Sequence, residues 1–277
     1  MNYYTALLLL FGTIAVSSVA LYLFFKQREA NRIEKLLQTP FSETYKKQLH
    51  HTPHYDKLSQ EDKEKIQHSI ILFINTKEFI GIDFEVTDEM KVIIAFYACL
   101  LLLHIETENC YDNLKTILIY PSAVMIDNLH TSNGIFTKEK FLIDGQSSND
   151  TVVIIWHDAK KEAYHLSHDN VIAHEFAHEI DFMDGEIDGV PPMTKSKYNE
   201  WTKVLFSDFN KLNSVASKNR DWGKYKLLGS YAATNEAEFF AVTTERFFES
   251  PQSLKKHFPE LYEELKGFYK IDMASIL

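Results

Sequence analysis

The stretch HEFAHEID, residues 174–181, contains two histidines four positions apart, with a glutamate directly after the first. Positions i and i+4 of an α-helix lie on one face, so both imidazoles can reach the same metal ion. Glu175 would lie beside that ion without binding it, close enough to take a proton from a water. Zinc lowers the pKa of a bound water and polarises a carbonyl, as peptide hydrolysis at neutral pH requires. The motif therefore predicts the active-site helix of a metallopeptidase.

A motif this short also arises by chance, as a polar helix face that carries two histidines. With 12 His in 277 residues, such a match is expected in roughly a few per cent of chains. The surrounding sequence favours the site, because the other helix faces are apolar, with Val171, Ile172, Phe176, Ala177 and Ile180. Asp181 lies three residues after His178, and we expect it to accept the second N–H of a ligand imidazole. The alternative for Asp181 is a solvated helix carboxylate.

Catalytic zinc sites normally use three protein ligands, so a third ligand must come from elsewhere in the chain. In the extended motif HExxHxxGxxH it would be Asp184, but that pattern needs glycine at the position of Asp181. Glu238 is the better candidate, since the apolar residues around it predict a core-packed helix. Glu245 lies on the same face of that helix, and we expect it to support a ligand or to replace Glu238 as one.

Composition narrows the chemistry of the site. The net charge of -10 argues against a nucleic-acid partner, because a phosphate-binding surface needs clustered Lys and Arg. Cys99 and Cys110 are the only cysteines, so a disulfide framework and a thiolate zinc cluster are both excluded. Histidines and carboxylates must hold any metal. Two further histidine groups are predicted to lie on the surface, namely His157, His165 and His168, and the metal-capable cluster His50, His51 and His54.

The N-terminal segment has no charged side chain from Tyr3 to Phe25. At about 1.5 Å per residue, a helix over 3–25 could cross a hydrocarbon core of about 30 Å. A cleaved signal peptide is the alternative, but no basic region precedes the segment. Lys and Arg follow the segment, so the positive-inside rule places the remainder in the cytoplasm. We therefore expect a single-pass membrane protein with a cytoplasmic catalytic domain.

The rest of the chain is predicted to form helices, then strands, then helices. This order is typical of one α+β unit rather than of alternating βαβ repeats. A polar linker is expected over residues 26–40, and a polar surface segment over 213–226. Expected helices cover 41–49, a segment from Ser59 capped toward Asp62, a segment from Thr87, the motif region from about Ser167, and the two segments TNEAEFFAVTTERFFES and SLKKHFPELYEELKGFYK. Expected strands cover 116–120, 123–126 and 151–156.

The segments HEFAHEID, DGEIDGVPP and YAATNEAEFFAVTTERFFESP resemble the glucose-regulated metallopeptidase family, also called Mlc titration factor A-like. The likeness extends from about Phe41 to Asp272, and the site alone also resembles the catalytic domain of anthrax lethal factor. It implies a zincin-like fold with one Zn²⁺ held by His174, His178 and Glu238. It further implies that Glu175 is the general base and that Tyr231 stabilises the oxyanion. Family members are mostly soluble, so the segment 3–25 is a departure.

These observations lead to one main prediction. Residues 1–32 form a transmembrane anchor with a polar flank, and 33–277 form a zincin-like α+β domain with a small mixed sheet packed on helices. The helical part of that domain covers about 41–110, and the catalytic part about 111–277. The expected activity is zinc-dependent hydrolysis of a peptide or protein substrate, with the peptide paired to the edge of strand 151–156. The alternative is a regulator that binds a transcription factor, because the resemblance implies interaction with a repressor of sugar uptake.

Overall fold

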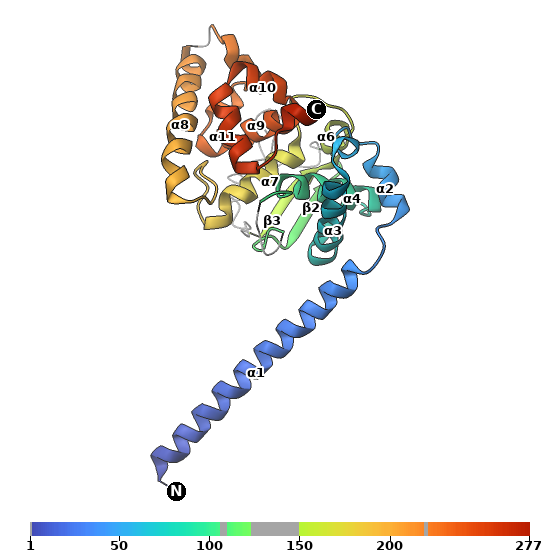
Figure 1. The fold of residues 1–277 in the computed structure, drawn as a ribbon, viewed down its shortest axis with the longest axis vertical. Helices are drawn as coiled ribbons and strands as arrows, with labels where there is room; N and C mark the ends of the chain where they lie inside the picture. The colour runs from blue at the N-terminus through green and yellow to red at the C-terminus, as the bar shows by residue number, and fades with distance from the viewer. Residues whose placement is uncertain (1, 106–109, 123–149, 219–220) are drawn as a thin grey trace. The chain divides into compact units, whose positions relative to one another are not determined.

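The computed structural model describes residues 2–105, 110–122, 150–218 and 221–277. It divides into two compact units, Met1–Phe41 and Ser42–Leu277. The first unit consists mainly of one helix, and the second contains the sheet, the remaining helices and every residue predicted for the site (Figure 1).

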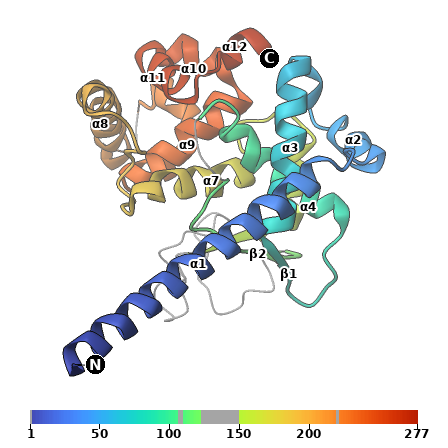
Figure 2. The same ribbon diagram turned by 60° about the horizontal axis from the view of Figure 1, so that its bottom comes forward.

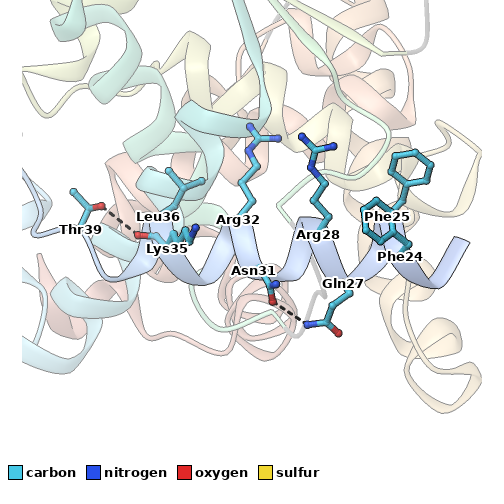
Figure 3. Close-up of a pocket in the computed structure, with 9 residues that line it drawn as sticks. All are labelled: Phe24, Phe25, Gln27, Arg28, Asn31, Arg32, Lys35, Leu36 and Thr39. Carbon is cyan, nitrogen blue, oxygen red and sulfur yellow. Dashed lines mark hydrogen bonds between the residues drawn. The ribbon is translucent and has the colours of Figure 1, made fainter. Parts of the chain in front are cut away.

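Helix α1 (Tyr3–Leu37) continues through most of the segment predicted to be a linker. No Gly or Pro occurs between Phe25 and Leu37, so nothing in that segment interrupts the hydrogen bonds of the helix. Side chains one turn apart add local contacts. The Nε2 atom of Gln27 donates to the Oδ1 atom of Asn31 at 2.9 Å on one side of the helix, while Arg28 and Arg32 project from another (Figure 3).

The predicted transmembrane anchor over residues 3–25 is wrong, and so is the single-pass membrane location that depended on it. In the part of the chain that the structure describes, no helix combines the length and the apolar character needed to cross a membrane. The prediction depended on the absence of charged residues, which is not the same as apolar character. Polar or small residues interrupt the segment at Gly12, Thr13, Ser17, Ser18 and Tyr22.

The second unit begins with helices α2 (Glu43–Leu49), α3 (Gln60–Thr76) and α4 (Asp88–Leu101). Both predicted helix starts are confirmed. The hydroxyl of Ser59 accepts from the backbone N–H of Asp62 at 3.1 Å, and that of Thr87 accepts from Met90 at 3.3 Å. Each cap satisfies an amide that has no partner within the helix.

The sheet contains three strands, β1 (Glu78–Gly81), β2 (Thr116–Tyr120) and β3 (Thr151–Ile155), in the order β1-β2-β3. Both described strand pairs are parallel, so the prediction of a mixed sheet is wrong for the described strands. Helix α4 connects β1 to β2, which makes a βαβ unit that the element order did not predict. Strand β1 was not predicted because it is short and partly exposed. The strand expected at 123–126 lies outside the described residues.

The remaining elements follow β3 without another strand in the described part of the chain. Asn170 caps α7 at Ala173, so this helix begins after the predicted start at about Ser167. Helix α8 also covers part of the polar segment expected at 213–226. The bounds are α6 (Trp156–Ala163), α7 (Val171–Asp181), η3 (Phe182–Asp184), α8 (Lys195–Lys218), η4 (Gly223–Leu227), η5 (Tyr231–Ala233), α9 (Glu236–Glu249), α10 (Pro251–His257), α11 (Pro259–Tyr269) and α12 (Met273–Ile276).

Helix α7, which carries the motif, packs against β3 and α4 and also against α9 (Figures 1 and 2). Its apolar face is fixed by aromatic contacts. The ring of Phe176 lies 5.6 Å from that of Phe73 in α3 and 5.0 Å from that of Tyr111, and Phe176 is fully buried. Burying a side chain of this size contributes about 2–3 kcal/mol. The opposite face of α7 is thereby directed toward α9.

Candidate metal centre

Three side chains from two helices meet between α7 and α9. His174 and His178 come from α7, and Glu238 comes from the first turn of α9. Their ligand atoms all lie within 4.8 Å of one another, and all three residues are buried. The Nε2 atom of His174 lies 3.3 Å from that of His178, and the Oε2 atom of Glu238 lies 3.0 Å and 3.4 Å from these two nitrogens.

These separations fit a tetrahedral zinc ion. Ligands about 2.0–2.1 Å from such an ion lie about 3.3 Å from one another. The other ring nitrogen of His174 also has a carboxylate partner, because its Nδ1 atom lies 2.7 Å from Oε1 of Glu245. A neutral imidazole that donates its Nδ1–H to this carboxylate presents the lone pair of Nε2 to Glu238 and His178. Converging lone pairs and a carboxylate are the donor set that a divalent cation needs.

Glu245 links the start of α7 to the ligand face. Its other oxygen, Oε2, accepts from the backbone N–H of Asn170 at 2.8 Å. Arg246, the next residue of α9, lies against the same region, with its guanidinium 3.0 Å from Asp169 and in contact with the carbonyl of His168. The same guanidinium lies 3.6 Å from Oε2 of Glu245, so this carboxylate contacts Asn170 and Arg246 through Oε2 and the ring of His174 through Oε1.

Charge within the site follows from these contacts. Burial opposes ionisation of Glu238, but hydrogen bonds with the two imidazoles outweigh it and lower the pKa of Glu238 below its ordinary value. Burial likewise opposes charge on His174, but the carboxylates of Glu238 and Glu245 outweigh it and raise the pKa of His174, so binding of a metal ion at Nε2 would release a proton from that atom. The two acids thus make the centre strongly attractive to a cation.

The predicted general base and oxyanion donor both lie near the imidazoles. Glu175 is buried in the middle of α7, adjacent to His174 in sequence. Tyr231 begins η5, and its ring centroid lies 5.8 Å from that of His174. Helix α9 packs against η5, so the same helix that carries Glu238 also supports the segment with Tyr231.

The two aspartates after the motif lie elsewhere. Asp181 was expected to contact a ligand imidazole, but its Oδ2 atom accepts from the backbone N–H of Gly189 at 2.9 Å. The contact to an imidazole is made by Glu245 instead. Asp184 is exposed, and its carboxylate accepts from the backbone N–H of Glu186 at 3.2 Å. The structure therefore places Asp184 away from the ligand set that the extended motif would require.

A buried polar network between Asn170, Glu249 and His54 was not predicted from the sequence. Asn170 donates its Nδ2–H to Oε1 of Glu249 at 2.6 Å, and His54 lies 3.7 Å from the same carboxylate. His54 was expected in a solvated loop, but it is buried, with Nε2 3.0 Å from the carbonyl of Phe248 and Nδ1 3.3 Å from the hydroxyl of Tyr97. Only the N-cap pattern at Asn170 could have indicated part of this network. His157, His165 and His168 are exposed, as predicted.

Comparison with known proteins places the chain among metallopeptidases. The family described as glucose-regulated metallo-peptidase M90 matches residues 25–270. An uncharacterized protein of Synechocystis sp. (strain ATCC 27184 / PCC 6803 / Kazusa) is 35% identical over 227 residues, covering 79% of this chain and 80% of that protein. Mlc titration factor A of Serratia proteamaculans (strain 568) is 30% identical over 189 residues, covering 67% and 71%. Mlc titration factor A of Klebsiella pneumoniae (strain 342) is 27% identical over 219 residues, covering 78% and 81%.

Proposed function

Because this chain belongs to the glucose-regulated metallo-peptidase M90 family, we propose that it is a zinc-dependent peptidase. The observation that carries the proposal is the convergence of His174, His178 and Glu238 at separations that suit one tetrahedral ion. When bound, zinc would polarise the scissile carbonyl and lower the pKa of a water.

The protein's own groups have distinct roles in this proposal. Glu175 is buried beside the imidazoles and would take a proton from the attacking water and pass it to the leaving amine. Tyr231 would donate a hydrogen bond to the oxyanion of the tetrahedral intermediate. Glu245 would hold His174 in the tautomer that exposes Nε2.

The substrate would lie along β3. This strand ends the sheet order β1-β2-β3 in the described residues, and α7 packs against it. An extended peptide that pairs with β3 would gain backbone hydrogen bonds. The substrate class proposed is therefore an extended, unstructured peptide segment.

The test is cleavage of unstructured peptides by the purified full chain, with Glu175→Gln as the matched variant. We expect the wild-type protein to cleave, and a zinc chelator to abolish cleavage until zinc is restored. Glu175→Gln should bind zinc but lose activity by about 10²–10⁴-fold, the usual contribution of a general base. Equal cleavage by both proteins would show that a contaminant is responsible and would refute the proposal.

The relatives' name favours a second candidate function. Mlc titration factor A describes those proteins as titrating Mlc, and we propose as the alternative that this chain binds a transcriptional regulator on its peptidase scaffold. The two functions differ in their need for Glu175, because sequestration requires no general base. Full regulatory effect in cells expressing Glu175→Gln would favour binding, whereas loss of the effect in that folded variant would favour catalysis.

A further inference from the structure

Gly189 lies in the loop between the motif helix and α8 and contacts several helices. The backbone N–H of Gly189 donates to Oδ2 of Asp181 at the end of α7, and its carbonyl accepts from the indole Nε1–H of Trp201 in α8 at 3.1 Å. A third helix also packs against Gly189. The carbonyl oxygen of Glu236, at the start of α9, is so close that a Cβ added to Gly189 would lie 2.5 Å from it. Gly189 therefore joins three helices.

The contact with α9 depends on glycine in two ways. Gly189 has a φ of +80°, a conformation that side-chain-bearing residues adopt at a cost. The space that a Cβ would need is also filled by the backbone of Glu236, which cannot move aside as the end of a flexible side chain could. Gly189 is buried as well, so the loop backbone is packed against the first turn of α9.

The first turn of α9 is the turn that presents the third metal-binding side chain. Glu238 follows Glu236 by two residues, and its backbone N–H is bound to Oδ1 of Asn235 at 2.8 Å. Any displacement of this turn moves Glu238 relative to His174 and His178. A shift of a few tenths of an ångström matters here, because metal–ligand distances tolerate about ±0.2 Å.

Asp181, the last residue of α7, connects Gly189 to that helix. Its side chain is fully buried, and its second oxygen, Oδ1, makes no hydrogen bond within the described residues. Burial of a carboxyl group is costly, and the hydrogen bond from the backbone N–H of Gly189 offsets part of that cost, so Asp181 and Gly189 hold each other in place. Burial also raises the pKa of Asp181, to about 7.

We propose that Asp181 is a positioning residue that holds Gly189 against the first turn of α9 and thereby sets where Glu238 lies relative to the imidazoles of α7. The inference rests on the proposed zinc site, and it gives Asp181 a role different from a direct contact with a ligand. The two ends of α7 then contact α9 separately. At the start of α7, Glu245 accepts from the backbone N–H of Asn170; at its end, Asp181 accepts from Gly189, which packs against α9.

The test measures zinc affinity of the full chain by competition with a chromophoric chelator. Asp181→Leu removes the acceptor at similar volume, and Asp181→Asn retains an oxygen that can accept from Gly189. Gly189→Ala perturbs the same contact while it leaves Asp181 intact. Asp208→Leu is the matched control, because Asp208 is also a buried aspartate, bound to the hydroxyl of Tyr225 in a different part of the unit.

We expect Asp181→Leu and Gly189→Ala to weaken zinc binding by about 10- to 100-fold, the range found for residues that orient metal ligands. Asp181→Asn should stay near wild type, and Asp208→Leu should alter stability without altering zinc affinity. The visible absorption of Co²⁺, added in place of zinc, should change in Asp181→Leu in the same sense as in Glu238→Ala. Circular dichroism of the metal-free proteins establishes which variants are folded.

Wild-type zinc affinity in folded Asp181→Leu would overturn the inference, as would an equal loss in Asp181→Asn and Asp181→Leu. If Asp181→Leu does not fold, Gly189→Ala decides, and wild-type affinity in that variant overturns the inference. Failure of the wild-type protein to bind zinc would overturn the proposed function, and this inference with it. The two failures are therefore distinguishable by the wild-type titration alone.

Discussion

Replacing Glu249 by Gln should change how the stability of the protein depends on pH. Glu249 is 4% exposed, and its Oε2 atom makes no hydrogen bond within the described residues. Burial raises the pKa of Glu249 to about 8 from 4.5, with further increases from Glu245 and Glu162, while a hydrogen bond from Asn170 opposes the shift. The carboxyl is therefore protonated in the folded protein at pH values where it is ionised in the unfolded chain.

The sign and size of the effect follow from linkage. For a carboxyl whose folded pKa is raised, the stabilising contribution is fully present below its unfolded pKa and is lost as the pH rises through the folded pKa. One pKa unit corresponds to about 1.4 kcal/mol, so a shift from 4.5 to about 8 corresponds to at most about 5 kcal/mol. Glutamine does not ionise, and its side-chain oxygen can still accept from Asn170. Relative to wild type, Glu249→Gln should therefore gain up to about 5 kcal/mol in unfolding free energy between pH 5 and pH 9.

The assay is urea unfolding of both proteins at several pH values, followed by circular dichroism. Asp181 and Glu162 have pKa values raised by burial to about 7, and burial lowers the pKa of His54 to about 4. Both proteins contain these groups, so the difference between the two curves reports Glu249 together with its coupling to Glu162 and His54. The matched control is Glu260→Gln at an exposed glutamate of α11, which removes the same formal charge. A difference between wild type and Glu249→Gln that stays constant from pH 5 to pH 9 would refute the reasoning.

Three further predictions concern the metal centre and the helix caps. Glu238→Ala should lose most bound zinc while Asp184→Ala retains it, as measured by metal analysis of the purified proteins; the reverse result would move the third ligand to Asp184. Glu245→Ala should weaken zinc binding by about 10- to 100-fold, because His174 loses the carboxylate that orients it, and unchanged affinity in a chelator competition would contradict this role. Ser59→Ala should lower the unfolding free energy by about 1 kcal/mol, because an amide of α3 loses its cap; urea unfolding of that variant with an unchanged midpoint would argue against it.

The features that the sequence predicted well depend on neighbouring residues. The starts of α3 and α4 follow from Ser59 and Thr87, whose side chains bind amides three residues away. The spacing of His174 and His178 predicts a shared helix face for the same reason, since the geometry of one helix turn is local. Membership of the metallopeptidase family likewise followed from short quoted segments and is supported by the match over residues 25–270.

Other predictions failed because the deciding contacts join residues far apart in the chain. The expected partner of Asp181 was an imidazole on its own helix, but the observed partner is Gly189 in the following loop. His54 appeared to be a loop residue, yet α9 buries it against the carbonyl of Phe248. The anchor over residues 3–25 was predicted from the length of a run without charged residues, and the described helices do not bear it out.

By itself, the sequence determined the motif helix, the chemical types of the candidate ligands and the family, because periodicity, capping and residue type are properties of short segments. It nominated Glu238 through its predicted core-packed helix, through the resemblance and by comparison with Asp184, but it could not place this carboxylate beside a particular imidazole. The tertiary structure decided which carboxylate meets which imidazole, because packing of α7 against α9 brings Glu238 and Glu245 to opposite nitrogens of His174. It also decided that three parallel strands form the described sheet. Such pairings depend on how separate elements pack together, and no local pattern of residues encodes that packing.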